Sequence, residues 1–346
     1  MNPNPDSADS VESFQSLDTS HDHPLVRDPQ GEIWQRAFKT LERIQDQGLS
    51  RLDAKILAAT LEDLEQGFRA FSEHQHQRKI TIFGSARTDS QDPDYQQALK
   101  FAEAIVQQGY MVLTGGGGGI MEAGNRGAGL ENTFGLNIQL PFEQLANPIL
   151  ASSDRVINFK YFFSRKLFFV KESDGVVLFP GGFGTQDEAF ECLTLMQTGK
   201  TKLLPLVLLD QPGGRYWREW DDYIRDHLFT RGLISPEDLH LYTLTDDVEV
   251  ACHTITDFYR VLHSNRYVRD TLVLRLNHEI SDEVVEILNQ EFASIMSSGQ
   301  IEKSVALPEE GDPAIAHLPR LVMPFNQRNF GGLWNLIYRL NELVPA

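Results

Sequence analysis

The chain has 346 residues, of which 41% are hydrophobic, so it can bury the core of one large domain or two ordinary ones. Its formal net charge of −18 disfavours nucleic acid or an anionic membrane as a partner, because either would be repelled over most of the surface. The two cysteines, Cys192 and Cys252, form no CxxC pattern, so we expect neither a disulfide scaffold nor a thiolate metal site. No apolar run approaches the roughly 20 residues that span a bilayer, and we expect a soluble, cytoplasmic protein.

The N-terminal part divides into a tail and a helical lead-in. Residues 1–28 are polar and acidic without an apolar segment, which predicts a disordered tail and no secretory signal. Residues 29–77 form the lead-in, where apolar residues at helical spacing predict two amphipathic helices, the second capped by Ser50. The histidine pairs His21/His23 and His74/His76 have no third ligand at metal spacing, so no metal site is expected.

Strand and helix patterns alternate from residue 79 onward. The expected strands are 79–83, 110–114, 134–140, 155–159, 176–179 and 203–209. The expected helices are 95–108, 161–172, one that begins near Thr185 with acidic residues in its first turn, and 216–228. Such alternation predicts an α/β domain over residues 78–264, a Rossmann-like doubly wound parallel sheet with helices on both faces.

A further region follows this domain. Residues 268–346 show a strand, a helix, two strands and a helix, the pattern of a small C-terminal α+β appendage. We find no catalytic constellation in it, so packing or dimerisation is favoured over ligand sensing.

Three glycine-containing turns follow expected strands and should open at one edge of the sheet, where ligands of parallel sheets bind. Backbone N–H groups at such turns and at helix starts bind phosphate, so these glycines and their polar neighbours are candidate phosphate ligands. They are Gly84, Ser85, Gly115, Gly116, Gly117, Gly118, Gly119, Gly181, Gly182, Gly184 and Thr185.

The run of five glycines does not fit a dinucleotide site. Its third small residue would fall at Ile120, Met121 or Glu122, and no carboxylate follows the next strand. A Walker loop is also absent, because the Gly199-Lys200 pair closes a helix and lacks the upstream glycine. The remaining ligand that suits these turns is a single phosphate group.

The segment Pro180–Glu188 resembles the PGGxGTxxE signature of the Lonely Guy family, proteins long mislabelled as lysine decarboxylases. Arg165-Lys166 is similar to the family's Arg-Lys pair, and the other two glycine turns match in order and spacing. The resemblance covers roughly residues 78–262. It implies hydrolysis of the N-glycosidic bond of an AMP-like or cytokinin-type nucleoside 5′-monophosphate, which releases the free base and ribose 5-phosphate.

The resemblance also implies roles for particular residues. Arg165 and Glu188 would be the catalytic pair, and Met121 and Lys166 possible members of the base pocket. Neither a metal nor a cofactor is expected, since nothing marks a lysine for pyridoxal phosphate. The nucleotide would be the small-molecule partner, and a homo-oligomer is expected. The apolar residues offered for its interface are Ala189, Phe190, Leu193 and Met196.

A second interpretation stays open. On the same fold the chain could be a non-catalytic carrier of a nucleotide or of the molybdenum cofactor. The Arg165/Glu188 pair argues against this, because a carrier needs only the glycine turns. The sequence leaves the identity of the base undetermined.

Overall fold

The computed structural model describes residues 31–139 and 146–344. The chain divides into two compact units, residues 1–58 and 59–346. The expected tail over residues 1–28, with His21 and His23, lies outside the described residues, as does Leu140. Across the described ranges, none of the helices combines the length and apolar character needed to cross a membrane.

The described part of the first unit is helical, as predicted. It consists of α1 (Gly31–Asp46) and the beginning of α2 (Arg51–Phe71). Ser50 caps α2, because its hydroxyl accepts a hydrogen bond from the N–H of Asp53 at 3.2 Å. The remainder of α2 belongs to the second unit.

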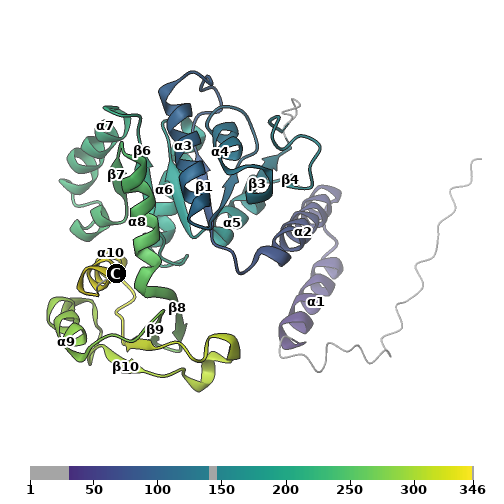
Figure 1. Ribbon diagram of the computed structural model, residues 1–346. Coiled ribbons are helices and arrows are strands. Elements are labelled where there is room, and N and C mark those ends of the chain that lie inside the picture. The colour runs from purple at the N-terminus through teal and green to yellow at the C-terminus, as the bar shows by residue number, and fades with distance from the viewer. Residues whose placement is uncertain (1–30, 140–145, 345–346) are drawn as a thin grey trace, which may run out of the picture. The chain divides into compact units, whose positions relative to one another are not determined.

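The second unit contains a seven-stranded parallel sheet with the order β4-β3-β2-β1-β5-β6-β7 (Figure 1). Its strands are β1 (Lys79–Phe83), β2 (Met111–Thr114), β3 (Thr133–Ile138), β4 (Val156–Phe159), β5 (Gly175–Leu178), β6 (Leu206–Leu209) and β7 (Thr243–Thr245). The chain winds outward from β1 to β4 and then returns to the other side of β1 with β5. A crevice for ligands is expected at this reversal, outside the carboxyl ends of β1 and β5.

Helices cover both faces of the sheet, which confirms the doubly wound α/β fold. One face carries α3 (Pro93–Gln107), α4 (Ile120–Ala128) and α8 (Val248–Val261). The other carries α5 (Phe162–Glu172), α6 (Phe183–Gln197) and α7 (Tyr216–Tyr223). The alternation within β1 explains the two layers: Ile80 and Ile82 enter the core beneath α3 and α4, whereas Phe83 packs edge-on against Phe169 of α5.

After α8 the chain builds a four-stranded antiparallel sheet with the order β10-β11-β9-β8. Its elements are β8 (Leu262–Val268), β9 (Thr271–Leu276), α9 (Asp282–Glu291), β10 (Glu302–Ser304), β11 (Arg320–Met323) and α10 (Phe330–Leu343). α10 packs back on the α/β part, where the Phe330 ring fills the space beside Gly199. The side-chain amide oxygen of Asn341 also accepts a hydrogen bond from the N–H of Val261. The two sheets therefore share one hydrophobic core.

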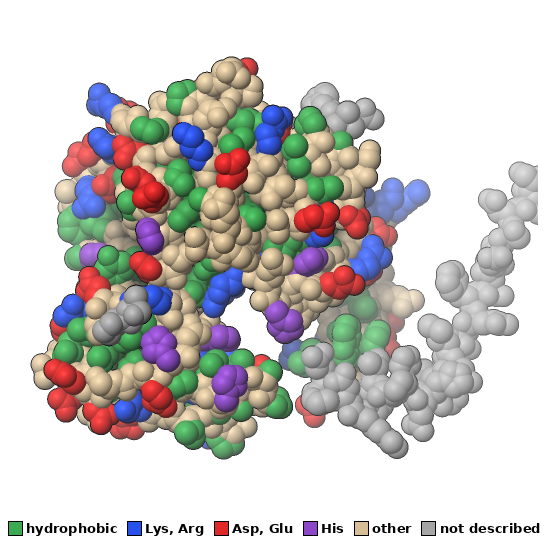
Figure 2. Space-filling model, in the orientation of Figure 1, with side chains coloured by type: hydrophobic (Ala, Val, Ile, Leu, Met, Phe, Trp, Pro, Cys, Tyr) green, Lys and Arg blue, Asp and Glu red, His purple; other side chains and the backbone are tan. Residues whose placement is uncertain are grey.

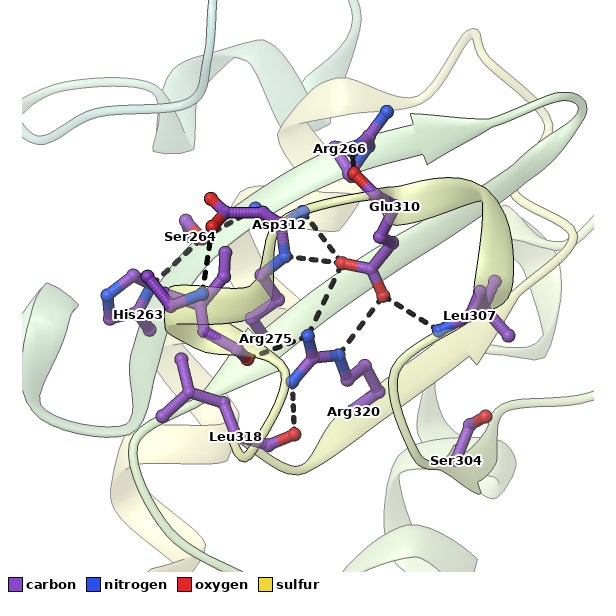
Figure 3. Close-up of polar contacts among 12 residues, drawn as sticks. His263, Ser264, Arg266, Arg275, Ser304, Leu307, Glu310, Asp312, Leu318 and Arg320 are labelled. Atoms are coloured by element: carbon purple, nitrogen blue, oxygen red, sulfur yellow. Dashed lines mark hydrogen bonds and ion pairs between the residues drawn. The ribbon is translucent and has the colours of Figure 1, made fainter.

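A buried group of charges, the Glu310 cluster, fastens the loop before β11 to this second sheet (Figure 3). It consists of Glu310, Arg275 of β9 and Arg320 of β11. Arg275 donates to Oε2 of Glu310 from Nε at 2.7 Å, and Nε of Arg320 donates to Oε1 at 3.1 Å. The N–H of Leu307 adds a bond to Oε1 at 3.1 Å, so both carboxylate oxygens are satisfied.

Charges of both signs are distributed over the surface. Figure 2 shows acidic and basic side chains intermixed on the face in view. The net charge of −18 is therefore not gathered there into a single acidic region.

Candidate functional site

The three glycine turns meet at the carboxyl edge of the large sheet, around a cleft of about 860 Å³. The candidate phosphate ligands that line it are Gly84, Ser85, Gly115, Gly117, Gly181, Gly182, Gly184 and Thr185. The structure thus brings together turns that are almost 100 residues apart in the sequence. Gly116, Gly118 and Gly119 are not among the lining residues and lie behind the wall of the cleft.

The turn after β1 ties the other two turns together. The N–H of Ser85 donates to the carbonyl of Pro180 at 3.1 Å, and the carbonyl of Ser85 accepts from the N–H of Ile120 at 3.0 Å. One of these bonds reaches the turn before α6 and the other reaches the first residue of α4. The cleft wall is therefore one connected backbone surface.

The glycine run after β2 requires its glycines for two reasons. Gly116 and Gly119 have φ values of 73° and 62°, which strain other residues. A Cβ on Gly119 would also clash with the carbonyl of Ser85. Asn147 secures the run from behind, since its side-chain amide donates to the carbonyls of Gly116 and Gly117 at 3.2 and 3.0 Å.

The turn after β5 places the N-terminus of α6 at the cleft. α6 begins at Phe183, two residues before Thr185, and the expectation of acidic residues in its first turn was wrong, because that turn holds none. No side chain caps this helix, which leaves its N-terminal end available to an anion. Tyr216, which no sequence pattern indicated, lines the cleft and donates its hydroxyl to the carbonyl of Gly181 at 2.5 Å.

Asp63 of α2 organises the N-terminus of α5, the helix that carries Arg165 and Lys166. This buried carboxylate accepts bonds from the N–H groups of Lys160 and Tyr161 at 3.0 and 3.2 Å, and from the Ser164 hydroxyl. α5 begins with Phe162 and has no cap from its own N-cap residue. Asp63 thus supplies the missing acceptor from almost 100 residues earlier in the chain.

Arg165 reaches the cleft between two aromatic rings. Its guanidinium carbon lies 5.1 Å from the ring centre of Phe162 and 5.5 Å from that of Phe169. Within the described residues, its buried Nε has no hydrogen-bond acceptor. Burial lowers the pKa of Arg165 from its usual value, and Glu188 and Asp187 counteract part of that shift. This arginine is therefore poised to donate to a group that enters the cleft.

Glu188 lies on α6, lines the cleft and is 6% exposed. Its carboxylate forms an ion pair with Nζ of Lys166 at 3.7 Å. Burial raises the pKa of Glu188 to about 7, although Lys166 and Arg165 pull it down. A carboxyl group that titrates near neutral pH can serve as a base or stabilise a developing positive charge.

Lys166 is not among the residues that line the cleft. It lies behind Glu188, where it also pairs with Asp187 at 2.8 Å and with Glu191. Burial works against its charge, but the hydrogen bonds with Asp187 and Glu191 outweigh that effect and raise the pKa of Lys166. Met121, the other residue expected at the base, does line the cleft, and its sulfur lies close to Gly115.

Several further residues complete the cleft. Phe162 and Phe183 line it with rings that are 53% and 97% exposed, and Asn137 contributes an amide at the end of β3. Phe183 is the variable residue of the signature at Pro180–Glu188, whereas no local motif marked Asn137. In the described part of the chain, no group of three or more His, Cys, Asp or Glu side chains is placed to hold a metal ion.

Comparison with solved structures finds proteins that match about half of this chain. A molybdenum cofactor binding protein from Rippkaea orientalis is 20% identical over 51% of this chain and 93% of its own, with a TM-score of 0.34. A molybdenum cofactor carrier protein from Chlamydomonas reinhardtii is 24% identical over 51% and 94%, with a TM-score of 0.36. DNA processing protein A from Helicobacter pylori is 15% identical over 51% and 79%, with a TM-score of 0.32. Among curated proteins, none matches the sequence significantly.

The family comparison is more specific. Residues 117–255 match the family model described as possible lysine decarboxylase. The match begins within the glycine run and includes α5 with Arg165 and α6 with Glu188. Over these residues the chain matches the model of the Lonely Guy family, which keeps that older description.

Proposed function

We propose that the chain hydrolyses the N-glycosidic bond of a nucleoside 5′-monophosphate to give the free base and ribose 5-phosphate. The observation that carries this proposal is the position of Arg165 and Glu188, which line the same cleft as the three glycine turns. The turns suit a phosphate group, and the charged pair suits chemistry on the sugar beside it.

Cleavage of this bond passes through a ribose with oxocarbenium character. The Glu188 carboxylate would stabilise that positive charge or activate the attacking water. Negative charge meanwhile develops on the departing base, and Arg165, whose Nε lacks an acceptor among the described residues, would donate to it. Asp187 is a poorer candidate for the carboxylate role, since it is already paired with Lys166 at 2.8 Å.

The test is a panel of purified nucleotides. AMP, GMP, CMP, UMP and an isoprenylated adenosine monophosphate are incubated with the protein, and ribose 5-phosphate is assayed. We expect release from an adenine nucleotide and much slower cleavage of adenosine, which lacks the phosphate. A folded protein that releases ribose 5-phosphate from none of them, or that retains a nucleotide unchanged, would instead favour the carrier interpretation.

We also propose that two copies of the chain associate beside the cleft. Of the interface residues expected from the sequence, Ala189 and Met196 are fully buried within one chain, whereas Phe190 is 39% exposed. Phe163 and Leu167 of α5 add further apolar surface, at 55% and 47% exposed. Light scattering of the purified protein should give the mass of a dimer or a higher oligomer. A monomer at micromolar concentration would contradict this.

A further inference from the structure

Arg87 follows the turn after β1 and lines the cleft. Its side chain is exposed, and within residues 31–139 and 146–344 the guanidinium takes part in no ion pair or hydrogen bond. The lining residues include one other arginine, Arg165, and two carboxylates, Asp187 and Glu188. A cation without a partner, at the mouth of a cleft in a chain of net charge −18, calls for a functional account.

The backbone around Arg87 is held firmly in place. Its N–H donates to the hydroxyl of Ser85 at 3.1 Å, and Ser85 is bonded to Pro180 and Ile120 through its own backbone groups. The carbonyl of Ala86 would lie 3.5 Å from a Cβ on Gly118. The residue before Arg87 thus packs on the second half of the glycine run, where α4 begins.

Arg165 approaches the same run from its other end. Its Nη1 would lie 3.8 Å from a Cβ on Gly115, the first glycine of the run. Both arginines therefore belong to the wall of one cleft, Arg165 beside Gly115 and Arg87 at the turn after β1. A phosphate bound in this cleft would have two arginines on the surrounding wall, which suits its charge and its several acceptor oxygens.

The two arginines differ in their surroundings. Arg165 is enclosed by the rings of Phe162 and Phe169 and feels the charge of Glu188. Arg87 is open to solvent at the entrance. The enclosed Arg165 is placed to stabilise charge that develops during the reaction. The solvent-exposed Arg87 is placed to bind the phosphate group as the substrate enters the cleft.

We propose that Arg87 is a phosphate-binding residue that makes the cleft select 5′-phosphorylated nucleosides over unphosphorylated ones. This assignment rests on the proposed function for its substrate class. The phosphate contact itself can be measured without any turnover. Arg87 would act on substrate binding and leave the chemical step to Arg165 and Glu188.

The experiment compares Arg87→Gln and Arg87→Lys with the wild type and with Arg69→Gln. Arg69 is an exposed arginine of α2 outside the cleft, paired with Glu65, so its substitution is a matched control for charge. The first readout is the affinity for inorganic phosphate by calorimetry at low and high salt. The second is kcat and KM for AMP and for adenosine.

We expect Arg87→Gln to weaken phosphate binding about 10- to 100-fold, the range of one lost charge-assisted hydrogen bond. Its affinity should also depend less on salt than that of the wild type. KM for AMP should rise with kcat unchanged, and the values for adenosine should not move. Arg87→Lys should recover part of the loss, because it keeps the charge without the planar fork.

Phosphate binding by Arg87→Gln that equals that of Arg69→Gln would overturn the assignment, as would a wild type that binds no phosphate. If the wild type binds phosphate through Arg87 but cleaves no nucleotide, the proposed function fails and the phosphate contact stands. If nucleotides are cleaved and Arg87→Gln behaves as the wild type, the assignment of Arg87 fails and the proposed function stands.

Discussion

The protein contains two buried groups of charged residues that differ in how completely they are paired. In the Glu310 cluster, both carboxylate oxygens accept hydrogen bonds, and the side chains of Glu310 and Arg320 are 3% and 0% exposed. In the cleft, Glu188 has an ion pair at 3.7 Å to Lys166, and Nε of Arg165 has no acceptor within the described residues. Burial is similar for the two glutamates, so the difference lies in the partners.

This difference is the one that we expect between the structural role of Glu310 and the proposed functional role of Glu188. Burial alone would raise the pKa of Glu310, but hydrogen bonds from Arg320, Leu307 and Arg275 outweigh it and hold the pKa at about 2. Glu188 lacks such donors, and its pKa is raised to about 7. A buried charge without a partner lowers the stability of the ligand-free protein. It favours binding of a ligand that supplies the missing partner.

The substitution Glu188→Gln should distinguish the charged residues of the cleft from the Glu310 cluster most clearly. We expect a loss of kcat of about 10²- to 10⁴-fold, the contribution of a positioned carboxylate, with stability at pH 8 equal to or above that of the wild type. The loss follows because the amide can neither accept a proton nor carry charge. Nucleotide assays and urea unfolding measure the two effects.

Glu191→Gln is the matched control for this variant, since Glu191 also contacts Lys166 from α6 but does not line the cleft. It should lose far less activity. Equal losses in the two variants would show that Glu188 acts only through Lys166.

Glu310→Gln should have the opposite profile. Removal of one partner from a buried ionic group leaves Arg275 and Arg320 without a counter-charge, which costs about 3–5 kcal/mol of stability. Activity per folded molecule should not change. Urea unfolding and kcat are the measurements, with Glu309→Gln as the control, because Glu309 forms an exposed pair with Arg269. A marginal change in stability would mean that the cluster is dispensable.

The pH dependence of stability should have opposite signs for the two glutamates. It is the smallest effect that we expect. Because the folded state raises the pKa of Glu188, the stability linked to this group is fully present below about pH 4.3 and lost as the pH rises to about 7, by roughly 3 kcal/mol. For Glu310, whose pKa is lowered, stability is present above the usual glutamate value and lost as the pH falls toward about 2.

If Glu188 acts as the carboxylate, kcat/KM should rise through about pH 7 while stability falls over the same range. Urea unfolding and kinetics between pH 5 and 8 measure this opposition. Glu188→Gln should remove the pH dependence of both quantities. A variant that keeps the slope of the wild type would exclude Glu188 as the titrating group.

Much of the α/β part could be predicted from the sequence, because its strands are short apolar runs and its turns contain glycine. β1 occupies the predicted residues. β7 and β8 were missed, since β7 has only three residues and residues 263–267 of β8 are polar or half-buried. α6 begins two residues early because Phe183 and Gly184 join the helix, although glycine there indicated a turn.

The residues that line the candidate cleft could be predicted where a local motif marks them, but not where distant segments meet. The three turns and the Arg165/Glu188 pair reach one cleft, as expected from the end of each strand. Tyr216 and Asp63 have no motif, because each acts through a single bond to a remote backbone group. Lys166 follows Arg165 directly, yet a helix turns about 100° per residue, so it points behind Glu188.

The central position of β1 in the sheet limits where recombination could divide this chain. The family segment at 117–255 leaves out β1, the strand between β2 and β5, together with Asp63, which orders the start of α5. A gene fragment cut at those limits would encode a sheet without its middle strand and a cleft without the Gly84–Arg87 wall. The segment that carries Arg165 and Glu188 is therefore not expected to form the cleft by itself, and a fragment meant to keep the cleft should begin upstream of Asp63.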